Sequence, residues 1–134
     1  MERRHAIIII RNKDGQYLQI SQDTWNSYLF LNCKIQDEND INSINRCVKG
    51  SLDVEPISIE YKFDKIHTKF SEKDKINKEY HHYFFVIDVN LESLLGEFEK
   101  NGNHFRWFSY EELLNDKRIQ QVNSGVVGFI KDTI

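Results

Sequence analysis

The chain has 134 residues and a mass of 16.0 kDa, the size of one ordinary domain and too small for two. Apolar residues make up 40% of it and aromatic residues 13%, which is enough for a hydrophobic core and excludes intrinsic disorder. Because the formal charge is −3, we expect no general nucleic-acid binding.

The cysteines and apolar runs bear on cellular location. The only cysteines, Cys33 and Cys47, do not have the spacing of a metal finger or a redox motif, so we expect reduced thiols and no disulfide scaffold. The longest apolar run, residues 6–10, is far shorter than the roughly 20 residues of a membrane-spanning helix. We therefore expect a cytoplasmic protein without membrane contact.

The N-terminal part predicts extended structure. Residues 5–10 are rich in β-branched side chains and are followed by an Asp-Gly turn, which predicts a buried strand. Residues 17–21 are expected to form its hairpin partner. Residues 28–31 predict another short extended segment.

A helix of about three turns is predicted next, from Asn39 onward. Its apolar residues recur at steps of three and four, at Ile41, Ile44, Val48 and Leu52. Gly50 within the helix costs about 1 kcal/mol relative to alanine. Pro56, the only proline, ends the helical pattern.

Strands dominate the middle of the chain. Residues 57–63 alternate between apolar and polar side chains and predict a strand. The polar residues 71–79 predict a loop. Residues 80–89, dense in aromatic side chains, predict a central strand.

The C-terminal part predicts a short strand and two helices. The strand covers residues 105–108, and Ser109 with Glu112 forms a capping-box signature for the helix that follows. A last helix is expected over residues 124–131. Together these elements predict a single α+β domain over residues 1–134, with a mixed sheet between helices.

This order of elements resembles the Nudix fold, an α/β/α sandwich. That family carries a signature written G, five residues, E, seven residues, R-E-U-x-E-E-x-G-U, where U is a bulky aliphatic residue. The pattern aligns here with matches at Glu38, Arg46, Val48 and Val54. The strand at 105–108 and its Glu-Glu-Leu-Leu helix also resemble the end of that fold.

The remaining signature positions depart from the family. Asn32 replaces the first glycine and Asp53 the last, while Cys47, Gly50 and Ser51 replace three glutamates. In the family those glutamates hold Mg²⁺ or Mn²⁺, which need oxygen ligands. The resemblance therefore implies a degenerate box without its usual metal site, in which no cofactor is expected and an ion pair of Glu38 with Arg46 remains structural.

Candidate ligand-binding residues lie outside the box. Trp25 and Tyr28 flank the bend before it and could stack on a nucleobase, although each could equally serve packing. His67 and Lys69 lie in a segment of cations and hydroxyls that suits phosphate oxygens.

His81 and His82 precede the aromatic strand. Neighbouring residues of a strand face opposite sides, so a metal site shared by these two histidines is not expected. One of them could face a common pocket with His67.

Three functions stay open. The first is a noncatalytic Nudix-like sensor of a nucleotide or nucleotide-derived small molecule, since the chain resembles Nudix domains associated with bacterial nucleotide second-messenger synthases in antiviral defence. The second is a Mg²⁺- or Mn²⁺-dependent hydrolase of a nucleoside diphosphate-linked substrate, with carboxylates recruited from Asp37, Glu38, Asp40 or Asp53. The third is a protein-interaction scaffold with a filled pocket.

Overall fold

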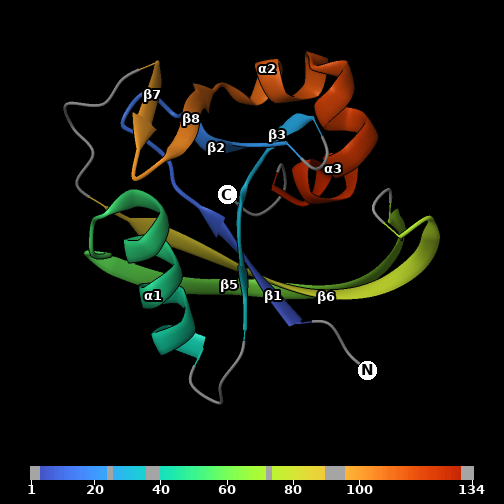
Figure 1. The fold of residues 1–134 in the computed structure, drawn as a ribbon, viewed down its shortest axis with the longest axis horizontal. Coiled ribbons are helices and arrows are strands. Elements are labelled where there is room, and N and C mark those ends of the chain that lie inside the picture. The colour runs from blue at the N-terminus through green and yellow to red at the C-terminus, as the bar shows by residue number, and fades with distance from the viewer. Residues whose placement is uncertain (1–3, 24–25, 36–39, 72–73, 90–95, 131–134) are drawn as a thin grey trace.

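The computed structural model describes residues 4–23, 26–35, 40–71, 74–89 and 96–130, together with the side chains of all of these except 67, 69, 122–125 and 129. Its elements form two four-stranded sheets and three helices (Figure 1). Among these residues, no helix has the length and apolar character needed to cross a membrane.

The first sheet is mixed and has the strand order β4-β1-β6-β5. Its strands are β1 (Arg4–Ile9), β4 (Leu31–Lys34), β5 (Ser58–Ser71) and β6 (Ile76–Asp88). Strand β1 pairs in parallel with β6, and the other two pairings are antiparallel. The prediction of a central strand from residue 80 is confirmed, because β6 pairs on both sides.

The second sheet is antiparallel and has the order β3-β2-β8-β7. Its strands are β2 (Tyr17–Gln22), β3 (Ser27–Leu29), β7 (Glu97–Lys100) and β8 (Asn103–Phe108). The helices are α1 (Asp40–Leu52), α2 (Tyr110–Asn115) and α3 (Lys117–Ile130).

The alternation of side chains in β1 separates two hydrophobic cores. Ala6 and Ile8 pack in the core that also contains the apolar face of α1. Ile7 and Ile9 point the other way, into the core that contains residues of α2 and α3. The predicted α+β class, with a mixed sheet between helices, is therefore confirmed.

The predicted helix after residue 39 is confirmed as α1. Ile44, Val48 and Leu52 are fully buried, each contributing about 1.5–3 kcal/mol by leaving water. The helix ends before Asp53, which adopts a positive φ of 55° and donates its N–H to the carbonyl of Lys49. Glycine is the usual residue in this conformation, so Asp53 ends the helix at some cost.

The capping box of α2 is also confirmed. The Ser109 side chain accepts a hydrogen bond from the backbone N–H of Glu112, whose carboxylate accepts one from the N–H of Ser109. The hydrogen bond from the Ser109 N–H is the main cause that holds the pKa of Glu112 below its ordinary value, and the nearby Arg106 adds to it.

Several sequence predictions for the strands are wrong. Strands β1 and β2 form no hairpin, because they leave their connecting turn in different sheets and share only a bridge between Arg11 and Tyr17. Residues 71–79 are not one loop, since β5 and β6 pair up to Ser71 and Ile76. Pairing between β5 and β6 provides the backbone hydrogen bonds of these polar residues, and the amino-acid composition alone does not indicate such pairing.

Three further differences concern element lengths and faces. Strand β7 was not predicted, and α3 begins seven residues before the predicted start at 124. A bulge in β5 between Tyr61 and Phe63 changes the facing of alternate residues. The exposed Tyr61 contacts Phe85 of one core, whereas Phe63 stacks on Phe84 in the other.

Gly50 tests the local energetics of α1. A Cβ at this helical position would meet no atom within 4 Å, so Gly50→Ala is expected to stabilise the protein by about 1 kcal/mol. Urea unfolding measures the change. The matched control is Gly15→Ala, also in open space but at a φ of +77°, which is expected to destabilise the fold. Equal effects of the two substitutions would contradict this explanation.

Candidate functional site

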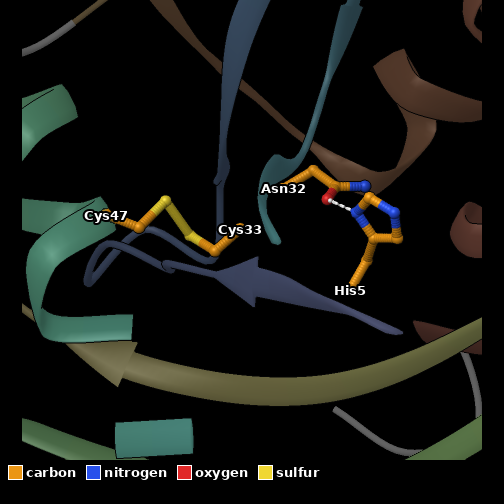
Figure 2. The surroundings of a disulfide bond; sticks show 4 residues. All are labelled: His5, Asn32, Cys33 and Cys47. Atoms are coloured by element: carbon orange, nitrogen blue, oxygen red, sulfur yellow. Dashed lines mark hydrogen bonds between the residues drawn. A yellow bond between two sulfur atoms is a disulfide. The ribbon is translucent and has the colours of Figure 1, made fainter. Parts of the chain in front are cut away.

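The helix position aligned with the second glutamate of the signature is occupied by half of a disulfide. Cys47 of α1 is bonded to Cys33 of β4, with a Cα–Cα distance of 5.9 Å (Figure 2). The expectation of reduced cysteines is therefore wrong for this structure. Their separation of 14 residues carries no pairing signal, because the contact arises only when α1 packs on β4. A sulfur in a disulfide offers no ligand to a hard cation.

The backbone carbonyls of the two positions aligned with the glutamate pair accept hydrogen bonds from the turn between β7 and β8. The side-chain amide of Asn101 donates to the carbonyl of Gly50, and that of Asn103 donates to the carbonyl of Ser51 at 3.3 Å. These carbonyls belong to the last turn of α1, which lacks partners within the helix. The two asparagines therefore hold the C-terminal end of the helix.

The described carboxylates of α1 cannot act together. Asp40 forms a 3.4 Å ion pair with Arg4 at the start of the helix, while Asp53 follows its end. A rise of 1.5 Å per residue separates them by about 20 Å, too far to share one cation. Among the described residues, no three His, Cys, Asp or Glu side chains gather in a way that could hold a metal. Asp37 and Glu38 lie outside the described residues.

Arg46 lies on the outer side of α1. It lines a depression of about 300 Å³ together with Asn45, Lys49 and Glu55. Lys49 and Glu55 form a 3.5 Å ion pair within it. The predicted pair of Arg46 with Glu38 remains a prediction, because Glu38 is not among the described residues.

A different cluster lies on the face of the first sheet that points away from α1. His5 and His82 occupy opposite positions in the β1–β6 pairing, with ring centroids 6.1 Å apart. The Tyr80 ring lies 5.6 Å from His82 and 6.2 Å from His5. Nδ1 of His5 is 2.8 Å from Oδ1 of Asn32. We call these four residues the His5 cluster.

Strand β4 contributes one residue to the disulfide and the adjacent residue to the His5 cluster. Figure 2 shows Cys33 pointing toward α1 and its neighbour Asn32 pointing to the other side, toward His5. His82 is 2% exposed, whereas Asn32 is exposed and His5 and Tyr80 are partly exposed. The His5 cluster therefore presents rings and an amide at the surface, above a buried imidazole.

Lys65 adds a cation to the same face. It lies opposite His82 in the β5–β6 pairing, and directly opposed residues of a sheet share a face. The side chain of Lys65 is exposed. Rings can stack on a base, an amide can pair with a base edge, and an ammonium group suits phosphate oxygens.

His81 faces the other way from His82, as strand geometry predicts. Its Nε2 is 2.5 Å from Oδ2 of Asp64, its ring stacks on Tyr83 at 4.3 Å, and its Nδ1 is 3.3 Å from the Tyr83 hydroxyl. His82 makes its ring contacts with His5, Tyr80 and Phe84 instead. The structure therefore separates the two histidines that the sequence places side by side.

The other predicted ligand residues are distributed differently. Tyr28 packs on Phe108, with ring centroids 5.1 Å apart, and burial raises the pKa of its hydroxyl. His67 and Lys69 lie in β5 opposite Tyr80 and Lys78, and their side chains are not described. Trp25 lies outside the described residues. No described contact joins Tyr28 to the His5 cluster, so its stacking role remains a prediction.

Sequence reasoning missed His5, Asn32 and Tyr80. His5 has no motif around it, and Asn32 stands out in the sequence only because it replaces the first glycine of the signature. Tyr80 was assigned to the aromatic strand without a role of its own. The parallel pairing of β1 with β6 joins segments over 70 residues apart and brings His5 to Tyr80, while the pairing of β1 with β4 brings it to Asn32.

The charges around Asp64 form a hydrogen-bonded network. The Tyr61 hydroxyl donates to Oδ1 of Asp64 at 2.6 Å, and this bond, followed by that with His81, lowers the pKa of the carboxyl group. The same bond raises the pKa of Tyr61 to about 12. The stabilisation linked to Asp64 is therefore present above its unfolded-state pKa and is lost as the pH falls through its folded-state pKa.

Asp64→Asn tests this network. Because the substitution removes the negative charge beside the hydroxyl, the pKa of Tyr61 is expected to fall from about 12 toward 10.0. NMR of ring-labelled tyrosine in an alkaline titration measures it. The control Asp88→Asn, whose carboxylate accepts from Ser58, leaves the Tyr61 titration unchanged. A Tyr61 pKa that stays near 12 without Asp64 would disprove the assigned cause.

Comparisons with known proteins agree on the fold. No protein-family model and no curated protein matches the sequence. Among solved structures, a Nudix hydrolase from Nitrosomonas europaea is 15% identical, with a TM-score of 0.69 over 98% of this chain and 88% of that one. A MutT structure from work on Aliivibrio salmonicida and Vibrio cholerae is 14% identical, with a TM-score of 0.67 over 98% of both chains.

A third similar structure is the Ap4A hydrolase of Caenorhabditis elegans. It is 13% identical, with a TM-score of 0.59 over 96% of this chain and 95% of that one. The chain therefore has the fold of Nudix hydrolases over nearly its whole length, which confirms the fold that the order of its elements suggested.

Proposed function

We propose that this protein is a noncatalytic Nudix-like domain that binds a nucleotide or nucleotide-derived signal through the His5 cluster. The observation that carries the proposal is that two neighbouring residues of β4 point to opposite faces of the sheet and make different contacts. On one face Cys33 forms the disulfide that takes the place of a box glutamate, and on the other Asn32 contacts His5. Three of the four box glutamates are replaced by other residues, which supports binding without metal chemistry, and the His5 cluster offers groups that suit a nucleotide.

The chemistry of this face suits a nucleotide better than an apolar ligand. His5 and Tyr80 offer partly exposed rings for stacking, and the Asn32 amide offers both a donor and an acceptor. Lys65 offers a charge to a phosphate group. The similar structures include hydrolases whose names specify Ap4A and, in one further case, UDP-X as the compound acted upon. A role in nucleotide-signalled antiviral defence is part of this proposal and rests on the resemblance of the sequence alone.

The proposal is tested by thermal unfolding with nucleotides, nucleoside diphosphate conjugates and cyclic oligonucleotides, each with and without Mg²⁺. A ligand at 100 times its dissociation constant adds about 2.7 kcal/mol, which raises the midpoint by several degrees. We expect a shift with one ligand class that does not require Mg²⁺. No shift with any compound would favour the scaffold function.

Variants locate the binding face. Asn32→Ala and His5→Ala are expected to abolish the ligand-induced shift of the unfolding midpoint. Each substitution removes one partner of the His5–Asn32 contact, and with it a group of the proposed binding face. The matched control is Asn45→Ala on the exposed side of α1, which is expected to retain the full shift. A shift that survives both cluster variants would place the ligand elsewhere.

Hydrolysis is the second candidate, and it depends on Glu38, the box glutamate that the sequence retains. If a metal-dependent activity on a nucleoside diphosphate conjugate is found, Glu38→Gln is expected to abolish it, because a neutral amide is a much weaker ligand for Mg²⁺. Product release is measured with and without chelator. Unchanged turnover in this variant would exclude Glu38 as the metal ligand.

A further inference from the structure

The two cysteines of the chain are joined across the interface between a strand and a helix. Cys33 lies in β4 and Cys47 lies near the middle of α1, so the bond fixes the helix to the sheet. The chain contains no other cysteine, so no other thiol within it can exchange with this disulfide. Its formation and reduction therefore form a simple two-state system.

Noncovalent contacts also hold α1 in place. The apolar face packs in the core through fully buried Ile44, Val48 and Leu52. Asn101 and Asn103 bond the carbonyls of the last turn. At the first turn, the 3.4 Å pair of Arg4 and Asp40 has side chains 39% and 30% exposed, and such pairs contribute little. Reduction would therefore remove the covalent link of α1 to β4 and loosen the helix, while the apolar core persists.

The two sulfur atoms differ in their surroundings. Cys33 is 1% exposed in the hydrophobic core, whereas Cys47 is partly buried. An attacking thiolate is therefore expected to reach the sulfur of Cys47, leaving Cys33 as the departing thiolate. Apolar surroundings disfavour that thiolate, so reduction proceeds mainly when α1 opens locally.

We propose that Cys33–Cys47 is a thiol–disulfide switch that locks α1 onto β4 when oxidised and releases it when a dithiol reductant opens the bond. One thiolate of the reductant attacks Cys47, the S–S bond breaks, and Cys33 takes up a proton. The second thiol then attacks the mixed disulfide, which releases Cys47 as a thiol. The reductant becomes a disulfide, and two electrons and two protons pass to the protein.

The switch is independent of the proposed ligand, so its test uses the protein alone. Oxidised protein is compared with the same protein in dithiothreitol, by thermal unfolding and by hydrogen exchange of residues 40–52. The disulfide joins residues 14 positions apart, and a loop of this length predicts that reduction lowers the unfolding midpoint by about 10 °C. Hydrogen exchange in α1 is expected to become about 100-fold faster. Exchange in β6 is expected to rise less.

The Cys33→Ala/Cys47→Ala double variant is the control. It is expected to behave like the reduced protein and to be insensitive to dithiothreitol, and the reduced wild type gives the same information if the variant does not fold. Two alkylatable thiols in protein kept under oxidising conditions would overturn the proposal, as would an unchanged midpoint and exchange rate. Complete unfolding on reduction would overturn it too, because the bond would then be a structural requirement.

Discussion

The parallel pairing of β1 with β6 is the contact on which the rest of the structure depends. Strand β1 has a hydrogen-bonded neighbour on each edge and a hydrophobic core on each face. The pairing of its backbone therefore also determines which core each of its side chains enters. A shift of one residue in this pairing would exchange the two faces and expose both cores. The same register sets His5 against His82, so the fold and the candidate binding face share one constraint.

The sequence predicts most elements whose signal is local. The helix of α1 follows from apolar residues on one face, and α2 follows from the Ser109–Glu112 capping box. Predictions were wrong where the structure depends on which strands pair with one another. The strands on either side of the first turn read as a hairpin, yet they separate into two sheets. Ser71 and residues 76–79, expected in a loop, are strand because β5 and β6 satisfy each other's hydrogen bonds.

The candidate site was less predictable than the fold. His82 was selected from sequence, but its neighbour His5, and the Asn32 that contacts His5, come from strands that only the folded sheet brings together. The disulfide has the same origin, since Cys33 and Cys47 meet through the packing of α1 on β4. A signature alignment can show which ligands are missing, but it cannot show the contacts that the replacing residues make, such as the bond of Cys47 to Cys33.

The bulge in β5 has a consequence for how this strand can change in length. Lys62 is the extra residue between Tyr61, which lies opposite Phe85, and Phe63, which lies opposite the next residue of β6, Phe84. Without Lys62, the residues on either side would already be in regular succession along β6. Loss of this one codon would therefore straighten the ladder and leave every remaining side chain on its present face.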